Sequence, residues 1–359
     1  MANVPLDIDV LVGAALAPII GVVVFWFLQL LFIEIQKRML LKLRHRHEAF
    51  CRFTNFIGIL FQTICHALGY TVTRSGIAAF QVTVNYGKVQ PKKEKTGVVE
   101  WIVNSFLLIG PFFIPAGLVL LFSYFVIGKG FTFPTPVHYT FVESLTNFGV
   151  SLSSFAHEFI GFLIHIDLFN PLHVGFLFVL LFFGLGIRPS YMGEERKEKI
   201  DMIHDLKNIK NHMVQKPLYI LFIILFIYAF YLISLFLNAR LYVSLFSVFG
   251  WMSLTAIIAL LLTYLVLLLI KTTDEIAARW KAIPFITLPV SYALARVFFI
   301  YYPMKQVESV SLIVMILSTL IITILLIKYK KTNRFKTATK MKHVRVADGK
   351  KRASKKRAD

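Results

Sequence analysis

Three polar residues interrupt an apolar stretch between residues 61 and 70: Gln62, Thr63 and His66. In zinc metalloproteases, a His-Glu-x-x-His sequence places two imidazoles one turn apart on one face of a helix. Both imidazoles bind the metal, and the glutamate activates the water that the zinc holds. In this register the chain has Gln62, Thr63 and His66, so only the second histidine of such a site is present.

The surrounding segment resembles the site-2 protease family of intramembrane zinc metallopeptidases, in its archaeal and bacterial branch. The family motif is similar to His-Glu-Leu-Gly-His-Ala-Leu within a membrane helix, and residues 66–68 match its last three positions. The family continues with a short membrane-associated β element, which residues 77–89 resemble. It then has a span with Gly-Pro in its first half, and Gly110 and Pro111 resemble that feature.

In this family the third metal ligand is an aspartate that follows an Asn-Pro or Pro-Ser region of a later span. Asn170 and Pro171 resemble the first dipeptide, and residues 189–190 resemble the second. Residues 193–195, where the aspartate is expected, are instead Gly-Glu-Glu. The resemblance extends over residues 53–205 and leaves the four later spans unexplained.

The departures from the motif imply an inactive member of the family. Gln62 replaces the first histidine, and glutamine is a poor zinc ligand beside imidazole. Thr63 replaces the catalytic glutamate and cannot act as a general base near neutral pH. The resemblance therefore implies neither a catalytic residue nor a zinc cofactor. Without it, Gln62 and His66 would be interpreted as a polar pair between packed helices, worth about 0.6–2 kcal/mol.

A second polar cluster lies between residues 157 and 173. His157, His165 and His173 are eight residues apart, so successive histidines are offset by about 80° around a helix and share no face. A rearranged zinc site formed by His66, Glu158 and one of His157, His165 or His173 is the alternative under which the protein would be an active intramembrane zinc metallopeptidase. Ionisable groups at membrane depth are functional candidates by default. Glu158 and Arg296 would accordingly line the polar path of a transporter-like bundle.

The composition indicates whether these residues belong to a soluble protein or to a membrane protein. The 359 residues are 57% hydrophobic and 16% charged, with a mean hydropathy of +0.70. Soluble domains are nearer 45–50% apolar and about 25% charged. This excludes a soluble enzyme and predicts an all-α polytopic membrane protein of about eight transmembrane helices. Five spans are clear (10–33, 98–127, 217–237, 241–270, 309–327), and three are less clear (53–72, 172–187, 282–302).

One segment after the second helix has the period of a β-strand. Residues 80–86 alternate apolar and polar side chains, with Phe80, Val82, Val84 and Tyr86 on one face. A bare strand edge cannot lie in lipid, so this element must lie at the interface or pack against protein. An exposed edge also allows an extended client peptide to add as a further strand.

The net charge of +20 is concentrated at the C-terminus, where residues 328–359 contain fourteen Lys or Arg and two Asp. The positive-inside rule therefore predicts a multi-pass protein of the cell membrane with a cytoplasmic tail. The side on which residues 34–52 lie stays open. The expected tail contacts are with anionic lipid or the ribosome, and not with DNA. The residues expected to make them are Lys350, Lys351, Arg352, Lys355, Lys356 and Arg357.

These observations divide the chain into four segments. Residues 1–52 form the first span and a basic loop, residues 53–216 the site-2-protease-like core, residues 217–327 a further membrane region, and residues 328–359 the tail. The resulting hypothesis is an integral membrane protein that resembles an inactive site-2-type protease and binds a membrane-protein client. An active metallopeptidase, a transporter-like bundle and an accessory subunit of the membrane-protein insertion machinery are the alternatives.

Overall fold

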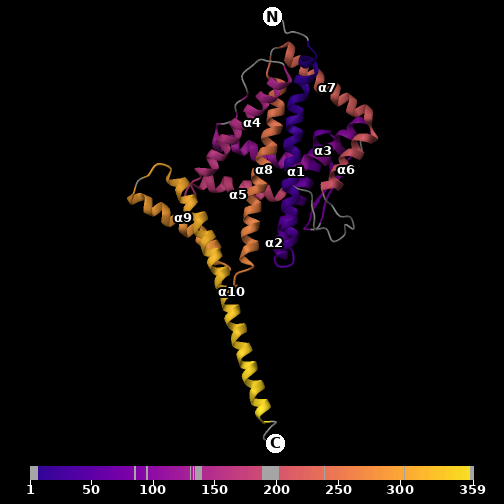
Figure 1. Cartoon of the computed structure of the whole chain (residues 1–359). Helices are drawn as coiled ribbons and strands as arrows, with labels where there is room; N and C mark the ends of the chain where they lie inside the picture. The colour runs from indigo at the N-terminus through magenta and orange to yellow at the C-terminus, as the bar shows by residue number, and fades with distance from the viewer. Residues whose placement is uncertain are drawn as a thin grey trace. The chain divides into compact units, whose positions relative to one another are not determined.

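Long apolar runs form helices here because a chain in lipid must satisfy its backbone polar groups within itself. The computed structural model describes residues 7–84, 86–93, 96–129, 131, 133, 140–187, 202–237, 239–302 and 304–355; side chains are not described at 106, 107, 202–205, 208 and 333–355. Figure 1 shows the elements in chain order. They are η1 (Asp9–Gly13), α1 (Ala14–Leu43), α2 (Glu48–Val72), β1 (Ile77–Val82), β2 (Gly87–Pro91), α3 (Val98–Ile127), α4 (Phe141–Ile164), α5 (Pro171–Gly186), α6 (Met202–Gln215), α7 (Pro217–Phe236), α8 (Leu241–Thr273), η2 (Ala278–Trp280), α9 (Ile283–Tyr301) and α10 (Val307–Lys355).

Within the described ranges, six helices are long and apolar enough to cross a membrane. They are Asp9–Leu43, Leu108–Ile127, Pro217–Phe236, Leu241–Thr273, Ala278–Tyr301 and Val307–Thr332. The protein is therefore an all-α membrane protein with a small two-stranded sheet. Six of the eight expected spans correspond to these helices, and the other two stay predictions.

The two expected spans that do not correspond to one of these six helices are 53–72 and 172–187, which lie in α2 and α5. The 16 residues of α5 measure about 24 Å, which is less than the hydrocarbon thickness of about 30 Å. Helix α2 is longer, but polar side chains interrupt it, among them Asn55, Gln62 and His66.

A β-hairpin replaces the single strand expected over residues 80–86. Strand β1 pairs antiparallel with β2, and Phe80 lies opposite Val89. The chain turns between the strands, where Thr83 N donates to Tyr86 O at 2.9 Å and Tyr86 N donates to Thr83 Oγ1 at 3.0 Å. Val84 and Tyr86 consequently lie outside both strands. The threonine hydroxyl bonds locally to the backbone and so competes with the ladder that the alternation predicted.

The chain divides into two compact units. The first comprises Met1–Leu163 and Asp167–Leu267, and the second comprises Ile164–Ile166 and Leu268–Asp359. Helices α1 to α7 and most of α8 therefore belong to the first unit, whereas α9 and α10 form the second. The segments expected from the sequence, with boundaries at 52, 216 and 327, stay a prediction.

In the first unit, tyrosine hydroxyls attach α7 to η1 and α8 to the start of α1. Tyr231 donates to the carbonyl oxygen of Val10, and Tyr242 donates to that of Ala15 at 2.6 Å. The same residues form a buried cluster with Ala14. Such interhelical hydrogen bonds add to the close packing that holds membrane helices together.

Helices α1, α5 and α8 meet at Gly184. The Gln36 side chain of α1 donates to Gly184 O at 3.3 Å. A Cβ at position 184 would overlap Thr263 Oγ1 and lie 2.6 Å from the carbonyl oxygen of Ala259, both on α8. Small residues allow membrane helices to approach this closely. Gly184 is therefore required by the crossing, whereas Gly175 on the same helix has open space around it.

We expect Gly184→Ala to destabilise the first unit and Gly175→Ala to leave it unchanged or slightly more stable. Overpacking typically costs about 1–3 kcal/mol, and alanine is the better helix former. The melting temperature of the detergent-solubilised protein measures both effects. Equal melting temperatures for the two variants would show that the α5–α8 crossing has been misassigned.

Candidate functional site

Thr63 lies at the contact between α2 and the β-hairpin. Its side chain is 3% exposed, and its hydroxyl donates to Ile59 O at 2.6 Å. Gly87, the first residue of β2, lies directly against it: a Cβ there would overlap Thr63 Oγ1 and lie 3.0 Å from Ile59 Cγ2. The backbone of β2 thus covers the position where the family motif has its catalytic glutamate.

The turn of the hairpin is also tied to α2. The side-chain amide of Asn55, two turns before Thr63, donates to Val84 O at 3.1 Å. Asn55 is 2% exposed. The hairpin is therefore held on α2 at two places, through its turn and through the start of β2.

Gly110 brings α3 close to the same part of α2. A Cβ at this glycine would lie 3.5 Å from Cys65 Cβ. Gly110 therefore lies beside the segment that contains Thr63 and His66. Pro111 and Pro115 are both accommodated inside α3.

The remaining motif residues on α2 are half-buried and are not joined to each other. No hydrogen bond between the Gln62 and His66 side chains occurs in the part of the chain that the structure describes. The interpretation of these two residues as a polar pair therefore gains no support.

Asn170 and Pro171 begin α5. The Asn170 side chain accepts a hydrogen bond from Leu172 N at 2.9 Å, and Pro171 is the first helical residue. This is the usual chemistry of a helix N-terminus. The dipeptide thus has a local structural role. Residues 189–190 and 193–195, which the resemblance also uses, lie outside the described residues.

The described residues contain no group of three or more His, Cys, Asp or Glu that could hold a metal ion. His66, Glu158 and His165 are therefore not brought together as a ligand set. His173 instead accepts a hydrogen bond from Asp167 N at 3.0 Å and packs edge-on against Phe162. A zinc site at these residues stays a prediction without geometric support.

Two buried glutamines on α1 were not anticipated from the sequence. Gln29 and Gln36 are both fully buried. Gln29 Nε2 donates to Phe112 O at 2.9 Å, directly after the Gly110–Pro111 pair, and Gln36 reaches α5. Their spacing of seven residues places them on the same helix face. Two amides at this spacing in an apolar span were the signal that could have identified them.

The hydrophobic side chains of the hairpin are partly available to a partner. Phe80 is 50% exposed, Val84 44% and Tyr86 47%, and Val82 is half-buried. In the described residues β1 and β2 pair only with each other. Each strand therefore has an edge without a strand partner.

In the second unit, Arg296 of α9 forms an ion pair with Glu308 of α10, with 2.7 Å between Nη1 and Oε1. The pair joins the two helices near the loop between them. Arg296 therefore has a clear packing role, which weakens the argument for a transport path that was based on its charge.

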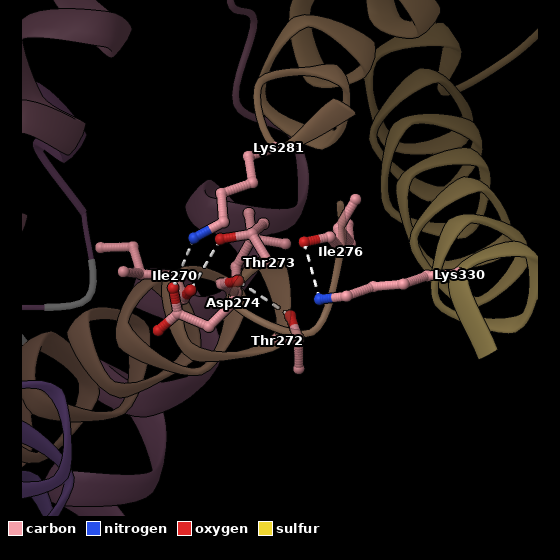
Figure 2. A network of polar contacts seen from close by, with 8 residues as sticks. Ile270, Thr272, Thr273, Asp274, Ile276, Lys281 and Lys330 are labelled. Carbon is pink, nitrogen blue, oxygen red and sulfur yellow. Dashed lines mark hydrogen bonds and ion pairs between the residues drawn. The ribbon is translucent and has the colours of Figure 1, made fainter. Parts of the chain in front are cut away.

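A polar network fixes the end of α8 to α10 (Figure 2). Lys281 Nζ lies 3.0 Å from Asp274 Oδ1, and the Asp274 side chain is 6% exposed. Lys330 Nζ donates to Ile276 O at 3.1 Å. The network lies where α10 passes from its apolar half to the basic tail.

The tail residues expected to contact lipid or the ribosome lie further along. Lys350, Lys351, Arg352 and Lys355 belong to the C-terminal end of α10, where side chains are not described. Lys356 and Arg357 lie outside the described residues.

We expect a Cβ at position 87 to displace the hairpin from α2. Gly87→Ala should lower the melting temperature, and Thr63→Ala in the same chain should recover part of the loss because it removes the overlapped oxygen. Contacting residues typically couple by about 0.5–3 kcal/mol in such a double-mutant cycle. Gly161→Ala, at a helical position with open space, is the control. Strictly additive effects would mean that Gly87 and Thr63 are not in contact.

No family model, curated protein or solved structure matches this chain.

Proposed function

We propose that this chain is a zinc-independent relative of site-2-type intramembrane proteases that binds a segment of a membrane-protein client. The observation that carries this proposal is the contact between Gly87 and Thr63. At the position of the general base, the chain has a buried threonine whose hydroxyl is already bonded to Ile59 O at 2.6 Å. No carboxylate is available there for proton transfer.

The hairpin is the proposed client-binding element. Its position is fixed by α2 at Asn55 and Thr63, so a client does not have to order it first. Its strands have unpaired edges, and an extended peptide can add to such an edge through main-chain hydrogen bonds. Pre-ordering of a binding element reduces the entropy lost on association.

Phe80 provides the apolar side chain at this edge. It is half exposed, and aromatic side chains gain much of their binding energy when a partner removes them from water. Hydrogen bonds from the strand edge would align the client strand with the hairpin. Phe80 and its neighbours would select apolar residues of the client. This combination suits a stretch of client chain next to a membrane span.

The basic tail has a separate proposed role. Placed in the cytoplasm, its charge would attract anionic lipid headgroups by about 1 kcal/mol per basic residue near the surface. The same charge suits the phosphates of a ribosome. Lys330 bonds the beginning of the tail to Ile276 O, in a loop that the Asp274–Lys281 pair holds together, and this would set the point from which the tail extends. This role is compatible with an accessory function in membrane-protein insertion.

Site-specific photocrosslinking in native membranes tests client binding. A photoreactive residue at Phe80 should capture a small, reproducible set of membrane proteins. The same residue at Phe53, an exposed position on α2 with no strand edge, is the matched control. The adduct from position 80 should weaken when Gly87→Ala displaces the hairpin.

Two results would contradict this part of the account. One is an identical pattern of adducts from positions 80 and 53, because it would reflect random collision in the membrane. The other is a position-80 adduct that Gly87→Ala leaves unchanged, because the docked hairpin would then be irrelevant to binding.

A further inference from the structure

An apolar cavity of about 450 Å³ lies within the first unit, between α1, α3 and α6. Its volume falls within the range of small-molecule sites, roughly 300–1,000 Å³. Apolar side chains from all three helices line it, including Val22 and Trp26, Ile109 and Phe113, and Leu206 and Ile209. It is distinct from the contact between α2 and the hairpin.

Helix α6, which forms one wall of this open cavity, is anchored at His212, between the lining residues Ile209 and Met213. Trp101 Nε1 of α3 donates to His212 O at 3.3 Å, and the His212 ring stacks on the Trp101 ring at 5.0 Å. His212 Nε2 lies 3.0 Å from Ser105 Oγ. These contacts fix the rotation of α6, so that the helix presents a defined face to the cavity.

That face is amphipathic. Ile209 and Met213 are one turn apart, and both line the cavity. Lys210 is exposed and is the one charged residue among the described residues that line it. A lysine stem can cover apolar surface while its ammonium group remains in the polar headgroup layer. Lys207 is exposed on the same helix but does not line the cavity.

We propose that the cavity holds one acyl chain of an anionic phospholipid and that Lys210 binds the headgroup phosphate. The lining is almost entirely apolar, so it favours an acyl chain over a polar ligand, which would lose hydrogen bonds to water there. A cation at the rim complements a negatively charged headgroup. Aromatic side chains are typical of the membrane–water boundary, and Trp101 and Tyr219 pack together beside α6. The chain thus carries a specific lipid as a structural ligand of α6.

Native mass spectrometry of the full chain tests this proposal. The protein is released from detergent in the presence of phosphatidylglycerol or of phosphatidylcholine with identical acyl chains. We expect one phosphatidylglycerol to remain bound to the unmodified chain. Lys210→Gln should weaken this binding about fivefold, as expected for one basic residue, whereas the matched Lys207→Gln should not.

Two further variants test the position of the acyl chain. Val22→Trp and Ile109→Trp each place a larger side chain in the cavity from a different helix, and both should remove the tightly bound lipid. Each variant must retain the melting temperature of the unmodified chain to be used. Leu225→Trp, at an exposed position on α7 outside the cavity, should retain the lipid.

Four results would overturn the proposal. Equal binding of the two phospholipids, or equal effects of Lys210→Gln and Lys207→Gln, would show that Lys210 does not recognise a headgroup. Retention of phosphatidylglycerol by stable cavity variants would show that the acyl chain lies elsewhere. Absence of any retained lipid from the unmodified chain would remove the site altogether.

Discussion

Close packing of α2 against its neighbours is the constraint on which the first unit depends. Gly87 of the hairpin meets Thr63, and this approach is possible because glycine has no Cβ; Gly110 of α3 lies beside Cys65. Membrane helices associate largely through such close contacts, since lipid tails offer no hydrophobic driving force. The same packing holds the hairpin in place on α2 at Thr63. In the function that we propose, this contact takes the place of a catalytic group.

The buried amides of α1 complete this arrangement. Gln29 and Gln36 each donate to a backbone oxygen of another helix, next to Gly110–Pro111 in one case and at the end of α5 in the other. The carbonyl of Gly184 is among the last four of its helix and has no intrahelical donor in the described part of the chain. The two amides thus fix α1 in register against α3 and α5. A slip of α1 along its axis would break both hydrogen bonds at once.

The sequence was informative where periodicity and hydropathy govern structure. Apolar runs identified the six described helices that are long enough to span a membrane, and the alternation at residues 80–86 revealed a β element. The hairpin itself was missed because the Thr83 hydroxyl turns the chain through local hydrogen bonds, which alternation does not report. The amide pair on α1 and the cavity beneath α6 were also missed. Both depend on which helices become neighbours, and a single sequence does not specify that.

We propose that the α2 segment forms no metal site, and the zinc content of the purified chain tests this proposal most directly. The full chain, purified from native membranes without chelators or a metal-binding tag, is analysed by plasma mass spectrometry beside His66→Ala. The account predicts far less than one zinc per chain in both proteins. About one zinc per chain that disappears in His66→Ala would contradict it.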